Sequence, residues 1–169
     1  MKKQNSFYSI WATFNNKNQI YLQKIKKKIN KELKGPDFPI HMTLFPSFLE
    51  KEKDIVKKMM TVLFKSEPFY IETNNYGYKN TFFQSFYVKI KKNKDFIYKK
   101  KIIDNLLNNK TKFFNPHISL YYGHKKHNTK KKIISKLPKL KKRIKVTNLC
   151  IAINNEKDLK WKIVEKIPI

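Results

Sequence analysis

Two short segments of the sequence carry the same arrangement of a histidine and a hydroxyl residue. In "HMTL" His41 precedes Thr43 by two positions, and in "HISL" His117 precedes Ser119 by two positions. Residues two apart on a strand project from the same face, so each segment would present an imidazole beside a hydroxyl. A single histidine on an apolar strand is usually a core residue, but a chain with four histidines that repeats the pattern predicts a functional site.

Two imidazoles at one site suit a reaction that needs two proton transfers. In the hydrolysis of a phosphodiester, a neutral histidine takes a proton from the attacking water and a protonated histidine gives one to the departing oxygen. The ordinary histidine pKa of about 6.5 allows either role near neutral pH. We therefore expect His41 and His117 to be the catalytic pair, with Thr43 and Ser119 donating hydrogen bonds to the phosphoryl oxygens. The scheme requires no metal and no cofactor.

The sequence lacks the residue patterns that metal-dependent catalysis and nucleotide-binding loops require. The sequence has no cysteine cluster, no His-Glu-x-x-His segment and no glycine-rich phosphate loop. His124 and His127 lie in a lysine-rich loop, and we expect both to be solvated surface residues, since neighbouring lysines disfavour a metal cation. Cys150, the one cysteine, stands between apolar residues and is predicted to be an inert core thiol.

Apolar periodicity predicts an alternation of strands and helices. A helix after the first strand should end at Gly35 and Pro36, with Gly35 as the left-handed C-terminal residue. The sequence from Ser47 to Glu50 fits a capping box and predicts that a second helix opens there. The expected strands are 6–14, 40–45, two within 68–92, 117–122, 144–153 and 159–167, and the expected helices are 18–33, 47–63, 93–109 and 129–137.

This order repeats strand, helix, strand, helix, with one His-x-Thr/Ser strand in each half. We therefore expect a pseudo-twofold α+β fold in which the two motif strands face each other across a cleft. No linker divides the halves, so residues 1–169 should form a single domain of two lobes.

The net charge is +27, and of the 39 basic residues only Arg143 is arginine. Drift of an AT-rich coding sequence explains much of this excess of lysine, which nevertheless favours an anionic substrate. The amino-terminal segment lacks an uninterrupted apolar stretch, and no stretch has the length of a membrane span. We expect a cytoplasmic monomer with no membrane partner.

The two motifs resemble the paired His-x-Thr/Ser signatures of the two-histidine phosphoesterases. "PHISLYYG" and "FFQSFYV" are most similar to segments of the plant-and-yeast-type cyclic phosphodiesterases within that superfamily. The glycine and arginine that usually follow the motifs in the bacterial RNA cyclic phosphodiesterase and ligase branch are absent. The resemblance implies a bilobal, pseudo-symmetric α+β fold with antiparallel sheets, helices on the outer faces and both motifs in a central cleft.

Carried over residue by residue, the resemblance also implies His41 and His117 as the catalytic pair, and Tyr122 as a further phosphate ligand beside Thr43 and Ser119. It gives Phe83 and Gln84, within a strand, as substrate contacts. The expected substrate is a small ribose cyclic phosphate, either ADP-ribose 1″,2″-cyclic phosphate or a nucleoside 2′,3′-cyclic phosphate. Two alternatives stay open: an RNA-end or 2′,5′-oligonucleotide phosphodiesterase, and a non-catalytic RNA-binding module built on charge and aromatic stacking.

Overall fold

The structure is a computed structural model that describes residues 7–49, 53–63, 68–108, 114–155 and 160–169. No described helix is long and apolar enough to cross a membrane. The strands are β1 (Phe7–Phe14), β2 (Met42–Leu49), β3 (Phe69–Gly77), β4 (Phe86–Lys91), β5 (His117–Tyr121), β6 (Arg143–Asn155) and β7 (Lys160–Pro168). The helices are α1 (Asn16–Leu33), α2 (Lys53–Leu63), α3 (Lys94–Leu106) and α4 (His127–Ile134).

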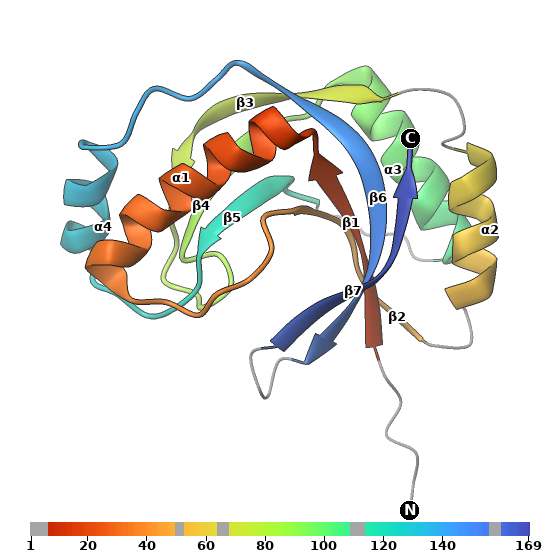
Figure 1. Cartoon of the computed structure of the whole chain (residues 1–169), viewed down its shortest axis with the longest axis horizontal. Coiled ribbons are helices and arrows are strands. Elements are labelled where there is room, and N and C mark those ends of the chain that lie inside the picture. The colour runs from red at the N-terminus through yellow and green to blue at the C-terminus, as the bar shows by residue number, and fades with distance from the viewer. Residues whose placement is uncertain (1–6, 50–52, 64–67, 109–113, 156–159) are drawn as a thin grey trace, which may run out of the picture.

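All described strands belong to one antiparallel sheet that closes on itself. The strand order is β1-β2-β5-β4-β3-β6-β7, and an additional pairing of β1 with β6 completes a ring of six strands. The long strand β6 makes this possible, because its first part pairs with β3 while its later part pairs with β7 on the same edge. Closure leaves few open edges on the ring. Figure 1 shows α1 and α4 on one side of the molecule and α2 and α3 on the other.

Helix α1 ends in a different way from the one that the sequence predicts. Lys34, not Gly35, adopts the left-handed conformation (φ 52°), and its N–H donates to the Asn30 carbonyl. Gly35 is required for another reason: a Cβ at this position would lie 2.5 Å from Cε2 of Tyr121. The glycine thus allows the chain after α1 to pass close against the end of β5.

The capping-box prediction is wrong. Ser47 lies inside β2, which continues to Leu49, and α2 is described only from Lys53, while Glu50 lies outside the described residues. Between Phe45 and Phe48, strand β2 has one more residue than its partner β1. This is a β-bulge, a place where an extra residue and a proline are both tolerated. Pro46 and Ser47 therefore extend the strand where the local sequence favours a helix start.

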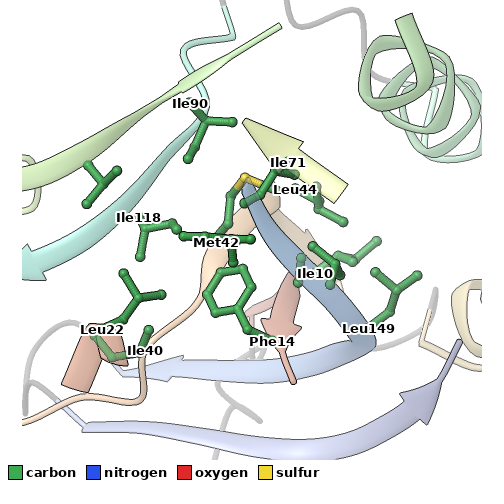
Figure 2. Packing of buried hydrophobic residues seen from close by; sticks show 14 of the residues in the cluster. Ile10, Phe14, Leu22, Ile40, Met42, Leu44, Ile71, Ile90, Ile118 and Leu149 are labelled. Atoms are coloured by element: carbon green, nitrogen blue, oxygen red, sulfur yellow. The ribbon is translucent and has the colours of Figure 1, made fainter. Parts of the chain in front are cut away.

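The two motif strands supply the centre of the core. Met42 in β2 and Ile118 in β5 are fully buried and are direct partners in the antiparallel pairing. Figure 2 shows both in the interior, among apolar side chains from β1, β3, β4 and β6. Burying a large apolar side chain contributes about 1.5–3 kcal/mol, so this packing fixes both strands. The other face of each strand is then left for polar residues.

Candidate active site

One cavity of about 490 Å³ is lined by all of the candidate catalytic and substrate-binding residues that the sequence predicts. Its volume lies within the usual range of small-molecule sites. The lining residues are Trp11, His41, Thr43, Pro46, Lys79, Phe83, Gln84, Phe114, Asn115, His117, Ser119, Tyr122 and Trp161. We call this cavity the histidine pocket. The functional roles of its residues remain predictions.

The pairing of β2 with β5 explains how the motifs meet. The register sets Met42 opposite Ile118, which are the central residues of the two motifs. Continued by one residue on each side, this antiparallel register sets His41 across from Ser119 and Thr43 across from His117. The motifs are therefore related by a local twofold rotation. They lie on directly paired strands, a closer arrangement than the two strands facing each other across a cleft that the sequence analysis predicts.

His41 immediately precedes β2 and is held by two contacts. Its ring stacks on the Trp11 indole, with ring centroids 3.5 Å apart and an interplanar angle of 9°. Its Nδ1 lies 2.7 Å from the Pro39 carbonyl oxygen. Because a carbonyl only accepts, Nδ1 must carry the proton, which leaves Nε2 as the nitrogen available to a ligand.

His117 repeats this arrangement from the other strand. Its Nδ1 lies 2.9 Å from the carbonyl oxygen of Asn115, again two residues earlier in the chain. The Tyr87 ring meets the imidazole edge to face, with centroids 5.3 Å apart. Both histidines are thus fixed in the same tautomer by the same local hydrogen bond.

Burial makes both imidazoles favour their neutral forms. Burial lowers the pKa of His41 to about 3, against a raising effect of the Pro39 hydrogen bond, and the nearby charges of His117 and Lys26 lower it further. Burial also lowers the pKa of His117, and so does the positive charge of Lys79. An anionic ligand would raise both values, because it favours the protonated forms. The site therefore gains proton affinity when a phosphate enters.

The low pKa of His41 predicts a loss of stability in acid. The unfolded chain binds a proton at a pKa of about 6.5, whereas folded His41 binds one only near pH 3. The free energy of unfolding should fall by about 2 kcal/mol between pH 7 and pH 5 through this residue. Urea denaturation at both pH values measures the change. His41→Asn should reduce the pH dependence, and an equally steep dependence in that variant would contradict the assignment.

Three hydroxyl side chains line the same pocket as the two imidazoles. Ser119 is buried, and its Oγ lies 3.5 Å from the Phe83 carbonyl oxygen. Tyr122 is only 6% exposed and stacks on Phe38 at 3.9 Å between ring centroids. Burial raises the pKa of Tyr122 to about 12, although its hydrogen bond with Ser119 acts in the opposite direction. The phenol therefore stays protonated and can donate a hydrogen bond to an oxyanion.

Phe83 and Gln84 line the histidine pocket, but they do not lie in a strand as predicted. They belong to the turn that precedes β4, which begins at Phe86. The turn is closed by the Lys79 N–H, which donates to the Gln84 carbonyl. Phe83 is 37% exposed and its ring meets Tyr122 edge to face at 5.3 Å. An exposed ring at a pocket rim is free to stack on a ligand.

Sequence reasoning missed six of the lining residues: Trp11, Pro46, Lys79, Phe114, Asn115 and Trp161. Trp11 and Trp161 are the two tryptophans of the chain, and both line it. Trp11 lies on the pocket face of β1, and the rarity of tryptophan was the only signal for either residue. Lys79 is the only lysine among the lining residues that the structure describes. Nothing in its local sequence separates it from the many other lysines.

The remaining histidines and the cysteine lie where they were expected. His124 and His127 are exposed, and Nε2 of His127 lies 2.8 Å from the Tyr78 hydroxyl. Cys150 is buried, with its sulfur 3.6 Å from the Thr13 hydroxyl. Within the described ranges, no group of three or more His, Cys, Asp or Glu side chains could hold a metal ion.

Several solved structures have an architecture similar to that of this chain. No protein-family model matches the sequence, and no curated protein matches it significantly. TT0787 of Thermus thermophilus superposes with a TM-score of 0.62 at 16% identity, over 96% of this chain and 97% of that one. Escherichia coli LigT in its apo form superposes with a TM-score of 0.59 at 12% identity, over 99% of each chain.

A third structure, a phosphoesterase, gives a TM-score of 0.57 at 10% identity over 97% and 98% of the two chains. This chain has the two-histidine phosphoesterase fold. The predicted α+β class is thereby confirmed, with the likeness extending over nearly the whole chain. Within this fold, the closer relation to the plant-and-yeast-type branch stays a prediction. E. coli LigT has also been solved with phosphate and with 3′-AMP.

Proposed function

We propose that the chain is a metal-independent cyclic phosphodiesterase that opens a ribose cyclic phosphate to a phosphomonoester. One observation carries the proposal: two imidazoles, each oriented by the carbonyl two residues before it, line one pocket with a hydroxyl residue from each motif. The solved structures of LigT with phosphate and with 3′-AMP support the choice of substrate class.

The proposed reaction uses the histidine pair as a base and an acid. A water proton passes to Nε2 of the neutral imidazole while the water oxygen bonds to phosphorus. The bond between phosphorus and one ribose oxygen breaks, and that oxygen takes the proton of the other imidazole. Thr43, Ser119 and Tyr122 donate hydrogen bonds to the phosphoryl oxygens, where negative charge increases. The net change is the addition of one water molecule, and both proton transfers are accounted for without a metal.

The aromatic residues of the pocket would hold the rest of the nucleotide. Phe83 and Trp161 present rings at the pocket, and aromatic stacking on a base contributes about 1–3 kcal/mol without demanding a particular base. The volume of about 490 Å³ suits a ligand of nucleotide size. We therefore propose broad tolerance of the base, with selectivity centred on the cyclic phosphate.

A substrate panel tests the proposed function. The native chain is incubated in EDTA with ADP-ribose 1″,2″-cyclic phosphate, nucleoside 2′,3′-cyclic phosphates and 2′,5′-oligoadenylates, and products are separated by chromatography. Turnover of a cyclic phosphate supports the proposal, whereas selective cleavage of the 2′,5′ oligomers supports the alternative phosphodiesterase. Tight, salt-sensitive RNA binding without any hydrolysis would instead identify the chain as an RNA-binding module.

The histidine pKa values predict an acidic activity profile. The productive free enzyme carries one proton on the pair, and the pKa values of both histidines are lowered from 6.5. The value of kcat/KM should therefore already decline with increasing pH between about 6.5 and 8, approaching tenfold per pH unit. Initial rates at low substrate concentration measure this decline. A flat profile from pH 5 to 8 would contradict the lowered values.

A further inference from the structure

A second hollow, of about 450 Å³, lies beside the histidine pocket and is lined by basic side chains. Its described lining residues are Asn80, His124, Lys125, Lys126, His127 and Lys130. We call it the basic hollow. Apart from Lys130, which is fully buried, these residues are exposed.

One turn separates the two cavities. Lys79 lines the histidine pocket, whereas its neighbour Asn80 lines the basic hollow. In the same turn, the Phe82 ring lies 6.2 Å from the ring of Tyr122, which lines the pocket, and 5.6 Å from that of His124, which lines the hollow. The two cavities therefore share a wall, and a ligand that extends out of the pocket over this turn reaches the hollow.

The shared wall is fixed by contacts from the other side of the hollow. The buried Nζ of Lys130, in α4, donates to the Lys79 carbonyl at 2.7 Å. The Gly123 N–H donates to the Phe82 carbonyl at 3.1 Å, and the Tyr78 hydroxyl lies 2.8 Å from Nε2 of His127. These bonds tie the turn to the segment that carries Lys125 and Lys126. A binding surface fixed in advance loses little entropy when a ligand binds.

The lysines around this wall lack acidic partners among the described residues. Among the ion pairs of the described residues, none includes Lys79, Lys125 or Lys126. In the proposed reaction, the two histidines and the neutral hydroxyl donors bind the phosphodiester in the histidine pocket. Lysine is a common ligand of phosphate as a point charge. The unneutralised lysines thus suit an anionic group of the substrate other than the one that reacts.

We propose that Lys79, Lys125 and Lys126 bind a second phosphate group of the substrate, next along the molecule from the phosphate in the histidine pocket. The proposal rests on the proposed function and narrows its substrate class to molecules with at least two phosphate groups. Two sources share this chemistry: the next phosphodiester of an oligonucleotide that ends in a cyclic phosphate, and the pyrophosphate of ADP-ribose 1″,2″-cyclic phosphate. A nucleoside 2′,3′-cyclic phosphate lacks the second group and is predicted to be a poorer substrate.

The kinetic test compares a substrate that has only the cyclic phosphate with substrates that carry at least one further phosphate group. Lys125→Met/Lys126→Met should raise KM about tenfold for a dinucleotide 2′,3′-cyclic phosphate or for ADP-ribose 1″,2″-cyclic phosphate, because lost phosphate contacts act on binding. The same variant should leave KM for adenosine 2′,3′-cyclic phosphate within about twofold. Lys131→Met/Lys132→Met, which removes equal charge from exposed positions of α4, is the matched control. Of the dinucleotide and the ADP-ribose substrate, the one that shows the larger loss identifies the source of the second phosphate.

A binding measurement tests the second-phosphate site even if no substrate is hydrolysed. Both tryptophans of the chain line the histidine pocket, so their fluorescence reports binding of 3′-AMP and of the dinucleotide ApAp. The native chain should bind ApAp at least about tenfold more tightly, and the Lys125→Met/Lys126→Met variant should lose this preference. An equal Kd ratio for the two ligands in native chain and variant would overturn the second-phosphate site. Such a result would leave hydrolysis of a one-phosphate substrate, and so the proposed function, intact.

Discussion

Replacing His117 by alanine should lower kcat/KM for a cyclic phosphate by about a thousandfold, the usual contribution of a positioned acid or base. His41→Asn should cause a loss of similar size. The two residues act on one reaction as a unit, so the double variant should be little worse than either single variant. Initial rates in EDTA with the best substrate of the panel provide the measurement.

The two substitutions differ in their structural effect, and the controls take account of this. His117 is half-buried and its removal should leave the unfolding transition nearly unchanged, whereas His41 is buried against Trp11, and asparagine retains only part of that contact. Circular dichroism should show folded protein in both cases. Added imidazole should restore part of the rate of His117→Ala, because it replaces the missing proton carrier. Tyr98→Ala, at an exposed position of α3, should keep full activity. Full activity in either histidine variant would refute the two-histidine mechanism.

Removing both motif hydroxyls should also have a large effect. Thr43→Val and Ser119→Ala should each lower kcat by about a hundredfold, because each removes a donor aimed at oxygens that gain negative charge in the transition state. The double variant should lose at least about a thousandfold, while KM changes much less. Steady-state kinetics over a range of substrate concentrations separates kcat from KM.

Thr13→Val provides the matched control for these hydroxyl variants. Thr13 is buried on β1 and contacts the Cys150 sulfur, but it does not line the histidine pocket. Its replacement therefore removes a buried hydroxyl of the same sheet without touching the proposed phosphate site. A hydroxyl variant that raises KM with kcat unchanged would show that Thr43 and Ser119 bind the substrate without stabilising its transition state.

The part of the site that lies on strands follows from local sequence. Alternation with a period of two predicts that Met42 and Ile118 enter the core while His41 and His117 share the other face. The structure has both apolar residues fully buried and both histidines in one pocket. The strand order, in which β2 and β5 become neighbours, depends on contacts between distant segments and was not predicted.

The features of the fold and of the site that the sequence did not predict depend on contacts between segments far apart in the chain. Ser47 fits a helix start locally, but pairing with β1 draws it into a bulged strand. Phe83 lies in an aromatic-rich segment that is typical of a strand, yet the turn that contains it is held by hydrogen bonds from Gly123 and from Lys130. Trp161 reaches the pocket only because β7 pairs with β6. None of these partners is visible in a short window of sequence.

The most direct test of the central claim is hydrolysis of the preferred cyclic phosphate in ¹⁸O-labelled water with EDTA, followed by phosphorus NMR. The account predicts one phosphomonoester isomer whose phosphate carries a single ¹⁸O atom, formed by the native chain and about a thousandfold more slowly by His117→Ala. This result requires that water attacks phosphorus and that one phosphorus–oxygen bond breaks. An unchanged cyclic phosphate, or a product without label on its phosphate, would contradict the account.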